Sequence, residues 1–186
     1  VNTYTRAALR SNGSIVLMPR FDAEELLAAV ERHRVTHLHL VPTMFVRLLK
    51  LPQEARGKYD LGSLEYVIHG AAPCPPEIKR QLIEWWGPII HEYYGATEFG
   101  MVTRSDSHEW LARPGTTGKA CVSLGVLANF TYQNQDAQRR EIERAGLVTA
   151  GDMGFLDEDG YLFLTDRKRD MIISGGANIY PAEVEA

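Results

Sequence analysis

The chain has 186 residues, enough for one domain with a hydrophobic core and part of a second. Hydrophobic residues make up 45% and charged residues 24%, as in ordinary globular proteins, and the net charge of −4 argues against a nucleic-acid binder, which would carry a basic face. Two cysteines cannot build a disulfide framework, and no apolar run reaches the roughly 18 residues of a membrane span. These features predict a cytoplasmic protein without a transmembrane segment.

The first part of the chain alternates helix-like and strand-like runs. Asp22 and Glu25 have the spacing of a capping box and predict the start of a helix. The β-branched and apolar run 36–41 predicts a strand after it. Pro42 ends that strand, and Thr43 is expected to cap the next helix.

The same alternation continues further along the chain. The apolar run 64–68 predicts a strand, and Pro75 and Pro76 suit the first turn of a helix that ends at Trp86, before a glycine and a proline. Residues 89–93 predict the next strand, with a loop after it. Strand, helix and strand at this spacing indicate βαβ units and a parallel sheet.

After Gly115 the pattern changes to short strands separated by glycines. Residues 155–164 predict a β-hairpin with Asp159 and Gly160 in its turn. Beyond Asp166 the chain is highly charged and then rich in glycine, which is typical of a linker or hinge.

Two loops follow predicted strands, where open parallel sheets bind their ligands. The first is Gly70-Ala71-Ala72-Pro73, whose small side chains allow a flat ring or a phosphate to approach the backbone. The second, 94–98, holds an aromatic ring that could cover a base, a hydroxyl for a phosphate and a carboxylate for magnesium. A core tyrosine, a capping threonine and a solvated glutamate would give the same sequence.

A third segment flanks the predicted hairpin. Gly151-Asp152 precedes it and Asp166-Arg167 follows it. A carboxylate can accept hydrogen bonds from both hydroxyls of a ribose, and a guanidinium adds a fork of donors. The alternative is that Asp152 and Arg167 only pair with each other across the ends of the hairpin.

Together these segments resemble the adenylate-forming superfamily of acyl- and aryl-CoA synthetases, luciferases and peptide-synthetase adenylation domains. Tyr94-Gly-Ala-Thr-Glu98 resembles its adenine and magnesium motif, and Gly151-Asp152 with 157–161 resembles its ribose motif. The run 166–185 resembles its hinge and the start of its mobile C-terminal domain, in the acyl-CoA synthetase form. The resemblance covers nearly the whole chain.

The resemblance implies an α/β fold made of three parts. Residues 1–118 would form the second α/β half of the large N-terminal domain, with the adenine, magnesium and acyl sites. Residues 119–168 would form a partial, distorted β-barrel with the ribose motif, and 169–186 the hinge and the beginning of a small mobile α+β domain. The implied partners are ATP, Mg²⁺, CoA and a carboxylic acid, which is converted to an acyl-adenylate and transferred to the thiol.

The resemblance also assigns roles to individual residues. The catalytic pair would be Thr97, which contacts the phosphate, and Glu98, which holds magnesium. The hinge would be Arg169, and Gly175 and Gly176 would line the thiol tunnel. The nucleoside would be bound by Ala71, Ala72, Pro73, Tyr94, Asp152, Leu164 and Arg167.

The expected acyl pocket is mostly small or apolar and has no fixed cation, which favours an apolar acid, either fatty or bulky and alicyclic. His69 is expected to be a polar strand-end residue rather than a base. The pocket residues are Val67, His69, Gly70, Gly95, Ala96, Gly100, Met101 and Val102.

The chain also departs from the family pattern. The phosphate loop that ends in Pro-Lys-Gly and the catalytic lysine of the C-terminal domain are not in the sequence. About two barrel strands are missing between Val126 and Leu127, through either a real deletion or a sequence that joins two segments across a gap. We favour the gap, because a deletion would leave the neighbouring barrel strands with unpaired edges. We therefore expect a fragment that is incomplete and inactive alone. A module that loads a carrier-protein thiol and a non-catalytic nucleotide-binding relic remain alternatives, and a homodimer is left open.

Overall fold

A computed structural model describes residues 2–96, 100–119, 143–144, 147–148, 152–167, 172–174 and 177–179. The chain divides into two compact units, Val1–His91 and Glu92–Ala186, and the boundary falls inside strand β3.

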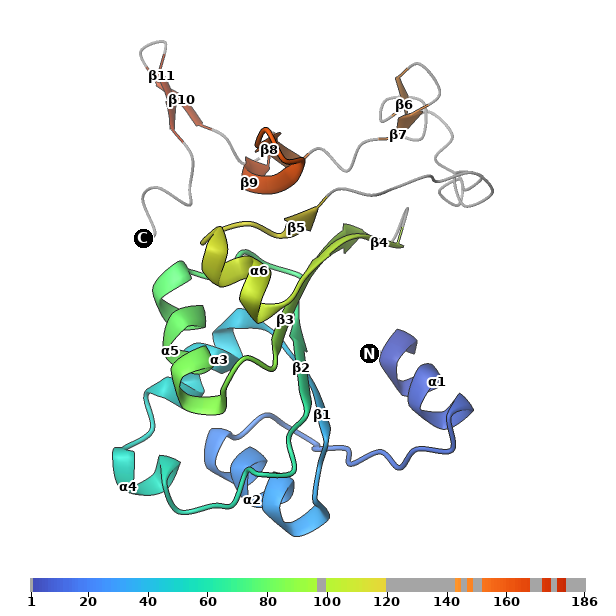
Figure 1. The fold of residues 1–186 in the computed structure, drawn as a ribbon, viewed down its shortest axis with the longest axis vertical. Coiled ribbons are helices and arrows are strands. Elements are labelled where there is room, and N and C mark those ends of the chain that lie inside the picture. Colours follow the sequence, from blue (N-terminus) through green and yellow to red (C-terminus); the bar gives the residue numbers. More distant parts are fainter. Residues whose placement is uncertain are drawn as a thin grey trace. The chain divides into compact units, whose positions relative to one another are not determined.

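The first unit alternates helices and strands, as predicted. In Figure 1, helices α3 and α5 lie on one side of strands β1 and β2, and α1 lies on the other. Its elements are α1 (Asn2–Arg10), α2 (Ala23–His33), β1 (His37–Leu40), α3 (Pro42–Leu49), α4 (Gln53–Arg56), β2 (Tyr66–His69), α5 (Pro76–Trp86) and the start of β3 (Ile90–Ala96). The longest of these helices have 11 residues, too few to cross a bilayer, and no helix in the described residues is long and apolar enough to do so.

Strands β1 and β2 are parallel and in register from His37 opposite Tyr66 to Leu40 opposite His69. The sheet has the order β1-β2-β3-β4, and the backbone N–H of Val67 donates to the carbonyl of Ile89 over 2.9 Å. The α/β fold with a parallel sheet is therefore confirmed. Strand β4 (Gly100–Ser105) is antiparallel to β3, so the sheet is mixed, with an antiparallel strand at its edge.

The helix ends follow local sequence signals in most places. The carboxylate of Asp22 accepts from the backbone N–H of Glu25 over 3.0 Å, as the capping box predicts. Pro76 is the first residue of α5, and Gly87 ends it with a φ of 83°. The cap at Thr43 is wrong, because Pro42 already forms the first turn of α3 and Val41 precedes it in an extended conformation.

The core of the first unit lies where α2, α3 and α5 pack together beside the strands. Its fully buried side chains include Leu27, Phe45, Leu48, Val67 and Leu82. Buried apolar surface of this kind supplies most of the free energy of folding.

Two ionisable side chains are buried with this core. His69 is fully buried, and its ring meets that of Phe45 edge-on at a centroid distance of 5.1 Å. Burial, together with the charges of the fully buried Lys79 and of His39, lowers the pKa of His69 to about 3. His69 is therefore neutral near pH 7.

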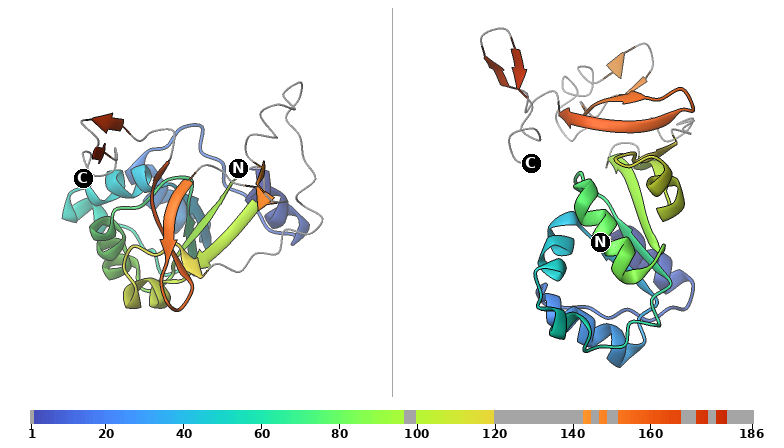
Figure 2. Two further views of the ribbon diagram at one scale, coloured as in Figure 1. Left: turned by 90° about the horizontal axis from the view of Figure 1, so that it is seen from above. Right: turned by 60° about the vertical axis from the view of Figure 1, so that its left-hand side comes forward.

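The second unit contains the β3–β4 hairpin and a small second sheet. Strands β5, β9 and β8 are antiparallel in the order β5-β9-β8, and Figure 2 shows β8 and β9 as a curved hairpin. The further elements of this unit are β4 (Gly100–Ser105), α6 (Ser107–Ala112), β5 (Gly118–Lys119), β6 (Glu143–Arg144), β7 (Leu147–Val148), β8 (Asp152–Leu156), β9 (Tyr161–Arg167), β10 (Ile172–Ser174) and β11 (Ala177–Ile179).

The predicted β8–β9 hairpin is confirmed. Its turn is held by the carboxylate of Asp157, which accepts from the backbone N–H of Asp159 over 3.1 Å and of Tyr161 over 2.8 Å. Gly160 has a φ of 83°, a conformation that glycine adopts without strain.

The segment after Tyr93 was predicted to be a loop, and this is wrong for its first part. Tyr94, Gly95 and Ala96 extend β3, because β4 returns along the strand and provides hydrogen-bonding partners. Tyr94 lies opposite Thr103 and Gly95 opposite Met101, so Val102 is the extra residue of a β-bulge.

Helix α6 was not predicted, although its start carries the same signal as α2. Asp106 and Glu109 form a complete capping box: the backbone N–H of Glu109 donates to Asp106 over 2.8 Å, and that of Asp106 donates to Glu109 over 3.1 Å. The helix buries Trp110, which is 1% exposed.

The first prediction concerns the pH dependence of stability. Between pH 6.5, the usual pKa of histidine, and the folded value of about 3, the unfolded chain binds a proton at His69 that the folded chain does not. Stability should therefore fall as the pH decreases through this range, by about 2 kcal/mol at pH 5 from this residue. Urea unfolding between pH 7 and pH 5 should show a shallower decline for His69→Leu. The exposed His33→Gln is the control, and an equal decline in all three proteins would contradict the assignment.

The second prediction concerns Gly95. A Cβ on this residue would lie 2.9 Å from the Cα of Met101 and closer still to the backbone of Gly100, so β3 and β4 would have to separate. Gly95→Ala should lower the free energy of unfolding by about 1–3 kcal/mol. In the control Gly57→Ala, the nearest atom to the added Cβ would be 3.5 Å away, an ordinary contact. Equal unfolding free energies for the two variants would refute the steric argument.

Candidate functional site

Two of the predicted site residues meet in the second unit, although 58 positions separate them in the sequence. The hydroxyl of Tyr94 in β3 donates to Oδ2 of Asp152, the first residue of β8, over 2.8 Å. Both side chains are partly exposed. The contact joins the tyrosine expected to cover a base to the carboxylate expected to bind a sugar.

The register of the β8–β9 ladder positions two more predicted residues. Arg167 lies directly opposite Asp152 in the ladder. Leu164 lies opposite Gly154, after a bulge, and is partly exposed. The ladder thus carries three of the predicted nucleoside-binding residues, Asp152, Leu164 and Arg167, on two adjacent strands.

A group of buried threonines connects the strand pair that carries Tyr94 to the hairpin that carries Asp152. The hydroxyl of Thr103, opposite Tyr94, donates to the carbonyl of Thr117 over 2.7 Å. The backbone N–H of Thr117 and the hydroxyl of Thr116 each donate to the carbonyl of Leu162 in β9, both over 2.9 Å. These bonds fix the strands that carry the two site residues.

Other candidates lie in the first unit. Val67 and His69 are fully buried in β2, and Gly70 is buried at its end. Ala71, Ala72 and Pro73 follow as an exposed loop, and Ala71 has a φ of 70°. A left-handed conformation at a residue other than glycine costs free energy and is often found at functional loops.

The remaining pocket candidates lie on the β3–β4 hairpin. Ala96 pairs with Gly100 at the end of the ladder, beyond the pair of Gly95 and Met101. Met101 is 50% exposed. The close approach of β4 gives Gly95 a structural reason to lack a side chain, independent of any ligand.

Several candidates lie outside the described residues. They are Thr97 and Glu98, the Gly151 that precedes Asp152, the hinge residue Arg169, Gly175 and Gly176, and the junction at Val126 and Leu127. Among residues that the structure does describe, no group of three or more His, Cys, Asp or Glu is placed to hold a metal ion. The division at residues 118 and 168 also stays a prediction.

Sequence reasoning missed Lys79 and Arg113. Lys79 is fully buried on the face of α5 that also buries Leu82 and Ile83. It precedes them by three and four residues, a spacing that indicates a shared helix face and could have predicted its burial. Arg113 follows α6 and contacts the β8–β9 turn, a long-range contact that local sequence does not indicate.

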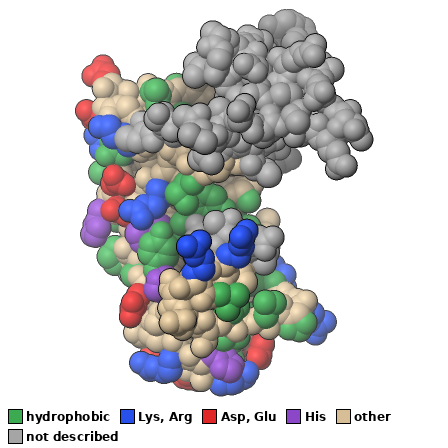
Figure 3. All heavy atoms as spheres, turned by 90° about the vertical axis from the view of Figure 1, so that its right-hand side faces the viewer, with side chains coloured by type: hydrophobic (Ala, Val, Ile, Leu, Met, Phe, Trp, Pro, Cys, Tyr) green, Lys and Arg blue, Asp and Glu red, His purple; other side chains and the backbone are tan. Residues whose placement is uncertain are grey.

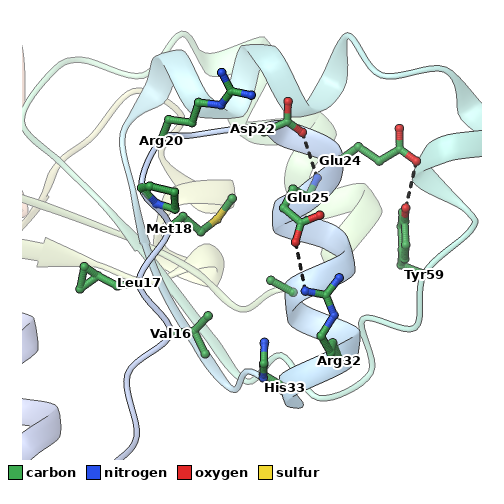
Figure 4. Close-up of a pocket in the computed structure, with 12 residues that line it drawn as sticks. Val16, Leu17, Met18, Arg20, Asp22, Glu24, Glu25, Arg32, His33 and Tyr59 are labelled. Carbon is green, nitrogen blue, oxygen red and sulfur yellow. Dashed lines mark hydrogen bonds and ion pairs between the residues drawn. The ribbon is translucent and has the colours of Figure 1, made fainter.

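The first unit also has a pocket that contains none of the predicted site residues. It has a volume of about 610 Å³ and lies between the extended segment 16–20 and helix α2 (Figure 4). Its wall includes an ion pair of 3.1 Å between Arg32 and Glu25 and a hydrogen bond of 2.9 Å from Tyr59 to Glu24. Arg32 and Glu25 thus pair with each other within the pocket wall, and Asp22 caps helix α2.

The charged side chains on one face of the molecule are mixed in sign. Figure 3 shows the Lys and Arg side chains interspersed with Asp and Glu, and hydrophobic side chains between them. On the face shown, the coloured residues do not gather into a patch of one charge.

Comparison with known proteins shows that the chain is similar in sequence to CoA ligases. The chain is 31% identical over 210 residues to a probable CoA ligase from Humulus lupulus, covering 98% of this chain and 38% of that protein. It is 31% identical over 195 residues to a long-chain-fatty-acid–CoA ligase from Bacillus subtilis, covering 92% of this chain and 34% of that one. The chain thus spans well under half the length of these relatives.

Two solved structures share the fold of this chain. An amide bond synthetase from Marinactinospora thermotolerans matches with a TM-score of 0.83 and 26% identity, over 97% of this chain and 42% of that one. The O-succinylbenzoate coenzyme A synthetase from Bacillus subtilis, solved with ATP and a magnesium ion, matches with a TM-score of 0.78 and 26% identity, over 98% and 42% of the two chains.

The family itself is shown by the sequence profile of AMP-binding enzymes, which matches residues 2–129, well over half of the chain. This match, together with relatives that align over more than 90% of the chain, confirms the resemblance to adenylate-forming enzymes. The chain belongs to the AMP-binding enzyme family.

Proposed function

We propose that the chain is the nucleotide-binding part of an acid–CoA ligase, which activates an apolar carboxylic acid with ATP and transfers the acyl group to CoA. The observation that carries the proposal is the hydrogen bond between Tyr94 and Asp152. It joins the two segments that the resemblance assigns to adenine and to ribose. The names of the relatives, CoA ligases for fatty and aromatic acids, support the same activity.

In this proposal each nucleoside group has a matching side chain. The ring of Tyr94 would stack on the adenine, and Ala71 to Pro73, exposed and without bulky side chains, would flank it. The carboxylate of Asp152 would accept from the ribose hydroxyls while the Tyr94 hydroxyl holds one of its oxygens. Arg167, opposite Asp152 in the ladder, would add donors to the same sugar.

The first half-reaction joins the acid to AMP. A carboxylate oxygen of the acid would attack the α-phosphorus of ATP, and the bond to the pyrophosphate oxygen would break, giving acyl-adenylate and pyrophosphate. Thr97 would donate to a phosphate oxygen, and Glu98 would hold magnesium, which supplies positive charge near the reacting phosphate. These two assignments come from the resemblance, since both residues lie outside the described part of the chain.

The second half-reaction releases the product. The thiol sulfur of CoA would attack the acyl carbon, its proton would pass to solvent, and AMP would leave. Arg169 would be the hinge about which the C-terminal domain moves, with Gly175 and Gly176 in the thiol tunnel; all three stay predictions.

The proposed acid is apolar because the described acyl-pocket candidates are small, apolar or neutral. Val67 is buried, Met101 is half-exposed and His69 is uncharged, since its pKa is about 3. A neutral imidazole suits an apolar acyl chain better than a cation would, because it needs no counter-charge. The charge of the fully buried Lys79 contributes to the lowered pKa of His69 and so helps to keep its imidazole neutral.

The acceptor of the acyl group distinguishes the candidate functions. One structural neighbour is named as an amide bond synthetase, so an amine acceptor is a second candidate beside CoA. A carrier-protein thiol and a non-catalytic relic also remain, and a cytoplasmic location and a homodimer stay expectations.

The third prediction tests the ligase activity. The protein, expressed from its complete gene, should release pyrophosphate from ATP and Mg²⁺ only when an apolar acid is present, and should turn over continuously only with CoA. Glu98→Gln should lower the rate at least about 100-fold, because the magnesium ligand is lost. The measurement is coupled pyrophosphate detection across a panel of fatty, alicyclic and aromatic acids.

Glu158→Gln, an exposed residue of the β8–β9 turn, is the matched control and should retain the wild-type rate. Continuous turnover with an amine in place of CoA would identify an amide synthetase. A folded protein that binds ATP but releases no pyrophosphate with any acid would support the relic instead.

The fourth prediction tests the contact that carries the proposal. Tyr94→Phe keeps the aromatic ring but removes the donor to Asp152, so the Kd for ATP should rise about 3- to 10-fold. Tyr94→Ala should raise the Kd further, because stacking is also lost. Isothermal titration calorimetry measures both.

Tyr93→Phe is the control, since adjacent residues in a strand point to opposite faces. An unchanged Kd in Tyr94→Phe, together with a raised one in Tyr94→Ala, would show that the hydroxyl has no role in binding.

A further inference from the structure

Arg113 holds the β8–β9 turn from outside the hairpin. Its Nε lies 3.3 Å from Oδ2 of Asp157, and its Nη2 donates to Oδ2 of Asp159. Its guanidinium lies over the ring of Tyr161, 4.1 Å from the centroid. One side chain therefore contacts three alternate residues of the turn.

The geometry of this contact requires an arginine. A guanidinium can donate to two carboxylates along different edges while its flat face covers an aromatic ring, whereas an ammonium group is a point charge. The side chains of Arg113 and Asp157 are only 31% and 27% exposed, so water screens their ion pair less than a pair at the open surface. Hydrogen bonding to Asp159 raises the pKa of Arg113, as expected for a charged donor held in place.

The position of Arg113 in the chain ties the turn to the rest of the second unit. Arg113 directly follows α6, and its backbone N–H donates to the carbonyls of Glu109 and Trp110, both over 3.1 Å. Trp110 is buried. The guanidinium is thus anchored to a helix with a packed side chain, and the turn is anchored to the guanidinium.

The turn lies at one end of the hairpin and Asp152 at the other. The β8 strand runs from Leu156, next to the turn, back to Asp152, a length of roughly 15 Å. A hairpin held at the turn, at the Leu162 carbonyl and at Asp152 cannot tilt relative to Tyr94. Without the first of these contacts the carboxylate could move, and displacements of about 1 Å are costly in binding sites.

We propose that Arg113 is a positioning residue for the ribose contact: it fixes the acidic turn at 157–161 and so holds the carboxylate of Asp152 where the sugar hydroxyls bind. This rests on the proposed nucleotide site. Arg113 itself would not touch the nucleotide, so its loss should affect the recognition of the sugar and leave stacking on the base in place.

The test compares ATP with 2′-deoxy-ATP, measured by isothermal titration calorimetry on the protein expressed from its complete gene. The wild type should bind ATP about tenfold more tightly, because a hydrogen bond from the 2′-hydroxyl to a carboxylate is lost in the deoxy compound. Asp152→Asn shows how far the preference for ATP falls when the carboxylate itself is removed. Arg113→Gln should reduce the preference to within about twofold of that variant, Arg113→Lys should lie between, and the exposed β4 residue Arg104→Gln should match the wild type.

The outcomes separate this proposal from the function on which it rests. A wild type that does not bind ATP overturns both. A wild type that prefers ATP, beside a folded Arg113→Gln with the same preference and a lower melting temperature, shows that Arg113 only stabilises the fold and overturns the positioning role. If Arg113→Gln is unfolded, Asp159→Asn is measured instead, because it weakens one acceptor of the guanidinium. A preference for ATP that is reduced about twofold or more in this variant supports the proposal. An unchanged preference overturns it.

Discussion

The second unit depends on a junction at Thr117, where its two strand systems are joined by buried hydrogen bonds. The Thr103 hydroxyl donates to the Thr117 carbonyl, and the Thr117 backbone N–H donates to the Leu162 carbonyl. Thr103 is opposite Tyr94, and Leu162 belongs to the strand that pairs with β8. Because an unmatched polar group in such a place would cost about 1–3 kcal/mol, the junction permits little variation in the separation of the strands. The contact between Tyr94 and Asp152 is made possible by that fixed separation.

The two units differ in the groups that their proposed ligand-binding residues offer. The second unit supplies polar groups held by hydrogen bonds and an ion-pair cluster. The first supplies a buried strand end, where His69 is uncharged because burial makes its protonation unfavourable. A charged acyl group would have to be desolvated beside such residues, whereas an apolar one would not. The polar groups proposed to bind the nucleotide and the uncharged groups proposed to bind the acid thus lie in different segments of the chain.

Local signals in the sequence predicted local structure well. The cap at Asp22, the proline start and glycine end of α5, and the turn at Asp159 and Gly160 each depend on the conformational preference of one or two residues, which neighbours do not override. The sequence could not indicate that Tyr94 to Ala96 continue a strand, because that depends on the return of β4. The cluster around Arg113 was missed for the same reason, since its partners lie more than 40 positions away. Motif resemblance found Tyr94 and Asp152, and geometry alone showed that they touch.

The bulge at Val102 constrains the length of the chain as well as its composition. On one side of it Tyr94 pairs with Thr103, and on the other Gly95 pairs with Met101. Removing Val102, or adding a residue beside it, would move either the glycine or the threonine out of its pairing, and the side chains beyond the change would exchange faces. Among homologues of this chain, the two strands should therefore keep a constant number of residues around this bulge.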